Sequence, residues 1–268
     1  MSISSKIVDY FIKLKLRNKI IAIIIPVTLL AAWQQLGSLG YINQSILPVP
    51  TKVWSTLIDM IESGKLQKHI LVSCSRVLKG FCIGVGLGLT VGMLIGLFRP
   101  VEIALGAMIG IFRPIPAIAC VPILILMFGI GEISKISVIA IGSFWPVLLN
   151  TIQGMKSTDI KLLEVSTIFE KSRLKTLVKV VIPSAMPSII TGLRLGVSSS
   201  WTCVVTAEMI AASSGVGFLI TYARELAQPD LLLVGIASIG FIGLIIDLIV
   251  LKLQSLVLYW NAAPTKGD

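Results

Sequence analysis

Long apolar runs alternate with short polar segments along most of this chain. Six runs are close to 20 residues long and nearly free of charge. A helix needs about 20 consecutive, mostly apolar residues to cross the hydrocarbon core of a bilayer. The pattern therefore predicts an all-α polytopic membrane protein with about six transmembrane helices. The predicted spans are residues 20–39, 77–98, 101–128, 136–152, 189–210 and 231–251.

Composition and charge support a membrane protein and predict its orientation. Hydrophobic residues make up 55% of the chain and charged residues only 13%, whereas soluble domains carry roughly 25% charged residues. Lys and Arg concentrate in the segments that a cytoplasmic N-terminus would place inside, so we expect both termini in the cytoplasm. The same rule accounts for the net charge of +10 without a nucleic-acid partner. We divide the chain into a tail (1–19), a transmembrane domain (20–260) that includes a cytoplasmic loop (154–186), and a C-terminal tail (261–268).

The stretch after the first span predicts an amphipathic helix on the outer surface. The sequence LPVP favours an extended turn, because residues that precede proline avoid the helical region. After it, Val53, Leu57, Ile58 and Ile61 fall on one helical face. We expect this face to lie on the membrane surface.

The second span carries a glycine at every fourth position. Such a stripe lets another helix approach closely, and in lipid it is packing that drives helices together. We predict that this glycine face packs tightly against a neighbouring helix, with a place along the substrate path as the alternative. The stripe consists of Gly80, Gly84, Gly88, Gly92 and Gly96.

Charged residues and prolines inside predicted spans mark candidate sites on the substrate path. Arg113 is followed by Pro114 and Pro116, and broken backbone at membrane depth is tolerated where protein covers it or where it lines a water-filled path. Arg113 could instead lie at a span end and reach the headgroups. Glu208 could anchor a gate or support packing, whereas Asp247 is expected near the cytoplasmic interface.

The cytoplasmic loop contains a long, basic, amphipathic stretch, LLEVSTIFEKSRLKTLVKVVIPSAMP, at residues 162–187. Its apolar residues recur at helical spacing and predict two short helices that are too polar to cross the membrane. Pro183 and Pro187 are expected to end this helical run before the fifth span. A basic amphipathic helix could simply rest on anionic lipid, so the stretch alone leaves two interpretations open.

The arrangement around this loop resembles the permeases of binding-protein-dependent ABC importers. Glu164 matches the glutamate of that family's loop motif and Pro183 its downstream proline, but Glu170 stands where a glycine is usual. The stretches ILPVPTKVW, FRPIPAIACVPILILMFGIGEISKI, FWPVLLNT and WTCVVTAEMIAASSGVGFLI also resemble the branch that imports sulfonates, taurine and nitrate. The resemblance covers nearly the whole chain and implies the MetI-like fold of type I importers.

The resemblance also implies partners and a division of labour. Two copies of the permease would form the path in the cell membrane, two cytoplasmic ATPase subunits would bind ATP, and an extracytoplasmic binding protein would deliver a small oxyanion. In this scheme the loop docks on the ATPase. The residues expected to couple to it are Glu164, Val165, Ile168, Phe169 and Ser172.

The sequence offers little for other functions. It has no G-x-x-x-x-G-K-[ST] loop that could cradle phosphates, which agrees with an ATPase on another subunit and no cofactor in this chain. One histidine and scattered cysteines predict no metal site and no catalytic residue. An ion-coupled secondary transporter remains the alternative, with Glu208 and Asp247 as its candidate coupling acids.

Overall fold

The computed structural model describes residues 23–169 and 172–258, and every regular element in these ranges is a helix. The predicted all-α class is therefore confirmed. The predicted tails 1–19 and 261–268 and the position of Glu170 lie outside the described residues. The helices are Ile23–Ser38, α2 (Pro50–Glu62), α3 (Lys65–Leu97), α4 (Arg99–Phe112), η1 (Ala117–Cys120), α5 (Val121–Phe128), α6 (Glu132–Lys156), α7 (Ile160–Ile168), α8 (Arg173–Thr176), η2 (Leu177–Val181), α9 (Ile182–Ala211), α10 (Val216–Glu225) and α11 (Pro229–Val257).

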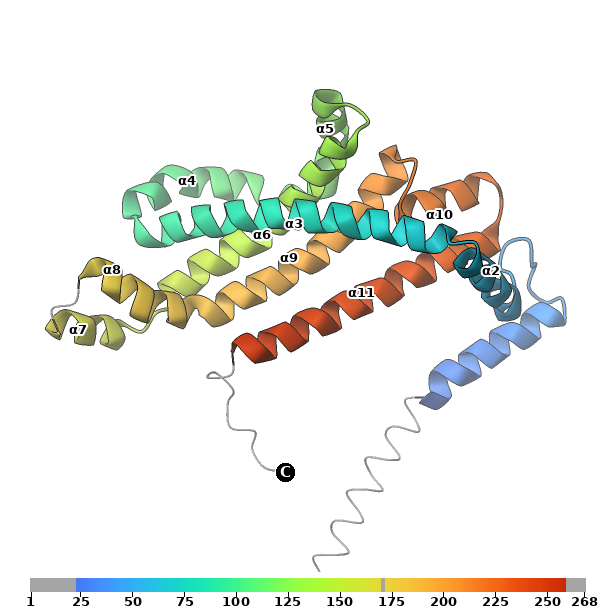
Figure 1. The fold of residues 1–268 in the computed structure, drawn as a ribbon, viewed down its shortest axis with the longest axis horizontal. Helices are drawn as coiled ribbons and strands as arrows, with labels where there is room; N and C mark the ends of the chain where they lie inside the picture. Colours follow the sequence, from blue (N-terminus) through green and yellow to red (C-terminus); the bar gives the residue numbers. More distant parts are fainter. Residues whose placement is uncertain (1–22, 170–171, 259–268) are drawn as a thin grey trace, which may run out of the picture.

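Four helices among the described residues are long and apolar enough to cross a bilayer: α3, α6, α11, and the continuous helix Leu174–Ala211 that contains α9. They run side by side along the long axis of the molecule (Figure 1). The pair formed by α4 and η1–α5 would make a fifth span, and helix Ile23–Ser38 is shorter than a span. The count of six spans stays a prediction.

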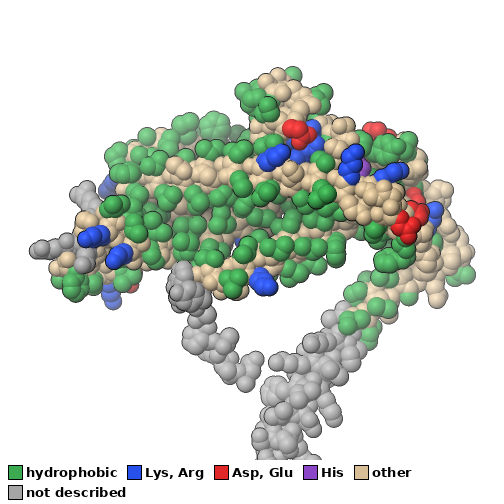
Figure 2. Space-filling model, viewed as in Figure 1, with side chains coloured by type: hydrophobic (Ala, Val, Ile, Leu, Met, Phe, Trp, Pro, Cys, Tyr) green, Lys and Arg blue, Asp and Glu red, His purple; other side chains and the backbone are tan. Residues whose placement is uncertain are grey.

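The four long helices give the bundle two distinct ends. At the α7 end lie α7, α8 and the C-terminal ends of α3 and α6, and at the α10 end lie α2, α10 and the starts of α3 and α11 (Figure 1). In the view of Figure 2 many charged side chains gather toward these ends, with a mostly hydrophobic face between them. This distribution suits helices that cross a membrane parallel to the long axis.

The centre of the bundle is the contact between α3 and α6, and the glycine stripe of α3 faces it. The first four glycines of the stripe are buried, and Gly96 is half-buried. A Cβ placed on Gly80 would lie 2.6 Å from the Cβ of Ile139, and one on Gly92 would lie 2.8 Å from the Cβ of Thr151. The two backbones can approach this closely only because the stripe has no side chains.

The third span, residues 101–128, was expected as a single helix, and this expectation is wrong. α4 ends at Phe112 and the chain turns before η1 and α5, which leaves the two arms bent by 85°. Pro114 and Pro116 cause the break, because each removes a backbone donor and disfavours helix at the residue before it. Pro116 itself is extended, with φ −61° and ψ 134°.

The amphipathic helix after LPVP exists as α2, but part of its apolar face packs on protein rather than on the membrane surface. Met60 of α2 is buried in a cluster with Leu66, Leu219 and Ala223. The Thr56 hydroxyl donates to the Asp230 carboxylate of α11 at 2.7 Å. The sequence could not show this, because the partners of α2 on α10 and α11 lie more than 150 residues further along the chain.

The sequence had predicted that Pro183 and Pro187 end the helical run before the fifth span, and this prediction is wrong. The chain stays helical from Leu174 to Ala211, over 38 residues, and passes through a π-helical turn at Leu177–Val181. A wider π turn just before Pro183 loosens the turn with which the proline ring would otherwise clash. One missing backbone hydrogen bond at Pro187 does not end so long a helix, because the neighbouring turns keep theirs.

Candidate functional site

At the α7 end, a short helix presents apolar side chains away from the bundle. α7 has nine residues and is too short to be stable on its own in water. The Asp159 carboxylate caps it by accepting the backbone N–H of Lys161 at 2.9 Å. A carboxylate at this position satisfies a free donor and interacts favourably with the helix dipole.

The exposed side of α7 carries most of the residues predicted to dock a partner. The exposed fractions are 48% for Val165, 76% for Ile168 and 68% for Phe169, which directly follows the helix. Glu164 is also exposed. An open hollow of about 470 Å³ is lined by Ile160, Leu163, Glu164, Thr167 and Ile168. Exposed apolar side chains around a hollow are typical of a docking surface.

A polar contact joins α7 to the helix that follows it. The hydroxyls of Ser166 and Thr176 lie 2.5 Å apart. Ser172 precedes α8, where its carbonyl accepts the N–H of Thr176 at 3.0 Å and its hydroxyl that of Lys175 at 3.4 Å. The predicted coupling residues thus lie together at the α7 end, on a segment attached directly to the continuous helix Leu174–Ala211.

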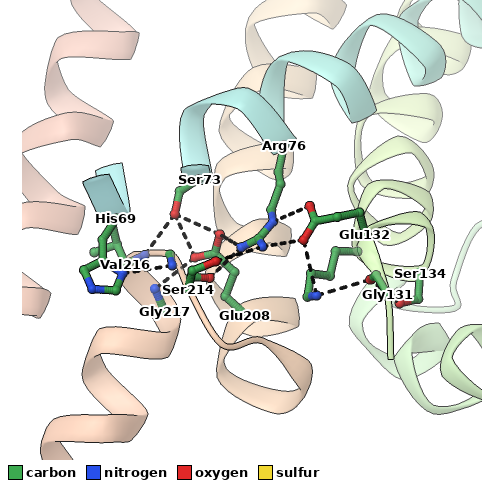
Figure 3. Close-up of polar contacts among 12 residues, drawn as sticks. His69, Ser73, Arg76, Gly131, Glu132, Ser134, Glu208, Ser214, Val216 and Gly217 are labelled. Atoms are coloured by element: carbon green, nitrogen blue, oxygen red, sulfur yellow. Dashed lines mark hydrogen bonds and ion pairs between the residues drawn. The ribbon is translucent and has the colours of Figure 1, made fainter. Parts of the chain in front are cut away.

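At the α10 end, a buried arginine joins three separate segments (Figure 3). The Arg76 guanidinium donates to both oxygens of Glu132 at the start of α6, at 2.8 and 2.5 Å. It also donates to Glu208 of α9 at 2.8 Å and to the Ser214 carbonyl at 2.6 Å. The side chain of Arg76 is only 5% exposed, and burial of a charge this deep requires such partners.

Glu208 lies on the inner side of this cluster and holds the turn between α9 and α10. Its side chain is fully buried and accepts hydrogen bonds from Ser73, at 2.8 Å, and from the backbone N–H of Gly217, at 3.0 Å. Gly215 in that turn has φ +115°, which favours glycine. These contacts support packing of the turn, and a gating role for Glu208 stays a prediction.

Sequence reasoning did not single out Arg76 and missed its burial. The signal was present in the glycine stripe, because Arg76 lies four residues before Gly80. Continuing the stripe toward the N-terminus would have put Arg76 on the same buried face of α3. Its partners, more than 50 residues away along the chain, could not be read from that spacing.

The remaining candidate residues on the substrate path lie at the elbow between α4 and η1. Arg113, Pro114 and Pro116 are all exposed there. The elbow therefore places a positive charge beside a broken backbone, and nothing in the contacts of the described residues gives it a ligand.

Asp247, expected near the cytoplasmic interface, forms an ion pair between two long helices, and its position relative to the interface stays a prediction. Its carboxylate oxygens accept from Nε and Nη2 of Arg194 at 3.0 and 3.2 Å, which forms an ion pair between α11 and α9. Asp247 lies ten residues before the end of α11, about 15 Å into the helix. Among the described residues, no group of three His, Cys, Asp or Glu side chains could hold a metal ion.

Comparison with known proteins identifies relatives for this arrangement. Residues 84–258 match the profile of the family described as binding-protein-dependent transport system inner membrane component. The chain is 37% identical over 239 residues to a putative aliphatic sulfonates transport permease protein, SsuC, of Bacillus subtilis, with 89% of this chain and 87% of that protein covered.

A second relative and a solved structure extend the similarity. The taurine transport system permease protein TauC of Escherichia coli is 32% identical over 238 residues, with 87% of this chain and 86% of that protein covered. An inward-facing structure of the MetNI methionine ABC transporter matches with a TM-score of 0.57 and 17% identity. It covers 70% of this chain and 95% of that chain, and the likeness concerns the fold.

Proposed function

The chain belongs to the binding-protein-dependent transport system inner membrane components and is a transmembrane permease of the ABC importer type, and we propose that its basic loop couples it to a separate ATPase. In this proposal the chain forms the path through the cell membrane, with both termini in the cytoplasm. A second copy completes the path, and an extracytoplasmic binding protein delivers the cargo.

The observation that carries the coupling role is the exposed apolar surface of α7. A helix that rested on lipid would turn its apolar side toward the bilayer and its charges toward water. Here Glu164 and Ile168 line the same open hollow, so polar and apolar groups lie side by side as they do on protein docking surfaces. Val165, Ile168 and Phe169 would enter a groove on the ATPase.

The position of α7 also supports coupling. When two ATPase subunits close on ATP, the docked helices of two permease copies are drawn together. Because α8 and α9 belong to one helix from Leu174 to Ala211, this movement reaches the membrane directly. Nucleotide binding must then favour one conformation of the path by a few kcal/mol.

The proposed cargo is a small organic oxyanion, and a sulfonate is the strongest candidate. The two relatives described above are named for aliphatic sulfonates and for taurine, and both kinds of molecule carry a sulfonate group. Delivery by a binding protein would supply most of the affinity. The permease itself then needs only weak contacts with the cargo as it passes.

An ion-coupled mechanism is disfavoured by the contacts of its candidate acids. A coupling acid has to gain and lose an ion during transport. Glu208 is fully buried and is held by Arg76, Ser73 and Gly217. Asp247 is occupied by Arg194. Glu208 thus lacks the open access that a coupling ion would need, and the charge of Asp247, although 38% exposed, is already balanced by Arg194.

Purification from the native membrane tests the coupling role. We expect the tagged wild-type chain to bring ATPase activity with it. Each apolar anchor removed from a docking surface costs about 2 kcal/mol, so Ile168→Ala combined with Phe169→Ala should lower the affinity by about a thousandfold. Ile46→Ala is the matched control, because Ile46 is 75% exposed but lies outside the basic loop.

Both variants should reach the membrane in normal amounts and elute as monodisperse protein. Full ATPase recovery with the double variant would exclude α7 as the docking surface and return the basic loop to a role on lipid. Absence of any ATPase with the wild-type chain would overturn the importer proposal itself.

A further inference from the structure

One face of α9 is lined with hydroxyl groups along most of the membrane-crossing length. Successive members of the set are seven, seven, four and four residues apart, a spacing that returns to the same side of a helix at 3.6 residues per turn. The first four are exposed and the last is half-buried. The set is Ser184, Thr191, Ser198, Thr202 and Thr206.

α11 shows what a lipid-facing surface of the same molecule looks like. Its exposed large side chains in the middle of the helix include Phe241 at 66%, Leu244 at 56% and Leu248 at 55%. Hydrocarbon tolerates such a surface at no cost. On α9 the exposed residues from 191 to 202 are Thr191, Leu195, Ser198 and Thr202, so hydroxyls outnumber large apolar side chains on this face although both helices are long enough to cross the membrane.

Water suits the α9 face better than lipid. The hydroxyls of Thr191, Thr202 and Thr206 donate to backbone carbonyls of their own helix at 2.9 to 3.2 Å. These bonds satisfy the hydroxyl donors within the helix, and the hydroxyl oxygens keep acceptor capacity for a further partner. A hydrated path beside α9 would supply that partner.

A charged group stands next to this face at the centre of the helix. Arg194 lies three residues after Thr191 and four before Ser198, which places it beside both on the helix surface. It is the thirteenth of the 30 residues of α9, about 18 Å from the start of the helix. The predicted fifth span, residues 189–210, includes Arg194, and charged side chains within spans usually face a water-filled cavity or a path.

The ion pair leaves Arg194 with capacity for a second partner. A guanidinium has five N–H donors, and the bonds to Asp247 use only Nε and Nη2. The side chains of Arg194 and Asp247 are each 38% exposed. By contrast, Arg76 is only 5% exposed and is shared among Glu132, Glu208 and Ser214.

From this geometry we propose that the hydroxyl face of α9 borders the transport path and that Arg194 contacts the anionic group of the cargo there. The inference rests on the proposed function, which makes the cargo a small oxyanion. A guanidinium fork matches two oxygens of a sulfonate. Asp247 orients the fork and balances its charge when the path is empty.

The same pair explains how binding stays weak enough for passage. An uncompensated arginine at this depth would hold an anion tightly, and a path must also release its cargo. With Asp247 beside it, the site is neutral before the anion arrives and carries one negative charge afterwards. The cargo is therefore attracted by the fork and repelled by the neighbouring carboxylate.

Thiol labelling tests the hydrated face without depending on transport. In a chain whose four free cysteines are replaced, Thr202→Cys should react with 2-sulfonatoethyl methanethiosulfonate, which does not cross membranes. Excess ethanesulfonate should slow the reaction at least tenfold. Leu244→Cys on α11 is the matched control and should remain unlabelled in the bilayer. Equal labelling of both positions, or none at Thr202→Cys with or without ATP, would overturn the inference.

Exchanging the two charges tests the role of Arg194 in particular. ATP-driven uptake of ethanesulfonate is measured in proteoliposomes that contain the complete transporter. Arg194→Gln should lower uptake at least tenfold while ATPase recovery is unchanged. The double variant Arg194→Asp with Asp247→Arg keeps an ion pair but moves the cation to α11, and it should remain defective. Restored uptake in the exchanged variant would assign the pair a purely structural role.

The two proposals fail in different ways. If the wild-type chain recovers no ATPase, the proposed function is wrong whatever the labelling shows. If ATP-driven uptake is normal in Arg194→Gln, the importer stands and the contact between Arg194 and the cargo is wrong.

Discussion

A single methyl group on the glycine stripe should separate the two central helices. In Gly80→Ala the new Cβ would lie 2.6 Å from both Cβ and Cγ2 of Ile139, and 2.9 Å from the backbone carbonyl oxygen of Ile136. Carbon atoms in contact prefer separations of about 3.5–4.0 Å, so α3 and α6 must move apart by about 1 Å at this point. Ile139 cannot turn away, because its Cβ is fixed to the backbone and its side chain is fully buried.

The cost follows from the packing that is lost along the contact. A gap of 0.5–1 Å forfeits about a quarter to a half of the dispersion energy of the atoms that line it, and overpacked sites typically lose about 1–3 kcal/mol. We therefore expect Gly80→Ala to destabilise the protein by about 1–3 kcal/mol. Because the four glycines that follow share the same contact, the separation would also loosen their packing.

Gly86→Ala is the matched control on the same helix. Gly86 is exposed, and a Cβ there would meet nothing within 4 Å. Alanine favours a helix over glycine by about 0.5–1 kcal/mol, so this variant should be neutral or slightly more stable. Thermal unfolding in detergent, followed by fluorescence-detected size exclusion, measures both. Equal melting temperatures for the two variants would refute the close packing of α3 on α6.

Two further predictions concern the α10 end. Glu208→Gln should destabilise by about 3–5 kcal/mol, because it takes one charged partner from a buried arginine. Glu132→Gln should destabilise the protein by less than about 1 kcal/mol, since that side chain is 57% exposed. Thermal unfolding in detergent compares the two variants. Equal losses of stability would mean that burial of the carboxylate does not determine its contribution. Gly215→Ala should destabilise by about 1–3 kcal/mol, because φ is +115° and a Cβ would strike the Glu208 carboxylate. Gly240→Ala, where a Cβ meets nothing within 4 Å, should stay within about 0.5 kcal/mol of wild type, and a similar melting temperature for both would contradict the described turn.

Much of the fold could be predicted from local pattern. Hydrophobic run length identified the long helices, and the four-residue repeat from Gly80 to Gly96 identified the face of α3 that lies on α6. Helical spacing also placed Val165, Ile168 and Phe169 on an exposed segment. These features depend on residues that are close together in the sequence, so spacing alone reports them.

The misses depend on distant contacts. The ion pair of Asp247 with Arg194, 53 residues earlier, could not be read from the apolar run in which Asp247 lies. Pro183 was expected to end a helix, which the π turn at Leu177–Val181 prevents. Pro114 and Pro116 were expected to break the backbone within one span, but the 85° angle between the two arms could not be predicted. The hydrophobic and polar pattern shows that a proline or a charge inside a span is unusual. It does not show which distant residues or which helical turn accommodate that residue.

The unbroken helix from Leu174 to Ala211 has a mechanical consequence. Its 38 residues make a rod of about 57 Å, with α7 attached at one end and the turn held by Glu208 at the other. If that turn acts as a pivot, a swing of about 10° displaces the opposite tip by about 10 Å, and Arg194, near the middle, by roughly half as much. The helix would thus rotate about the buried Glu208 carboxylate, and this rotation would move the hydroxyl face of α9 sideways.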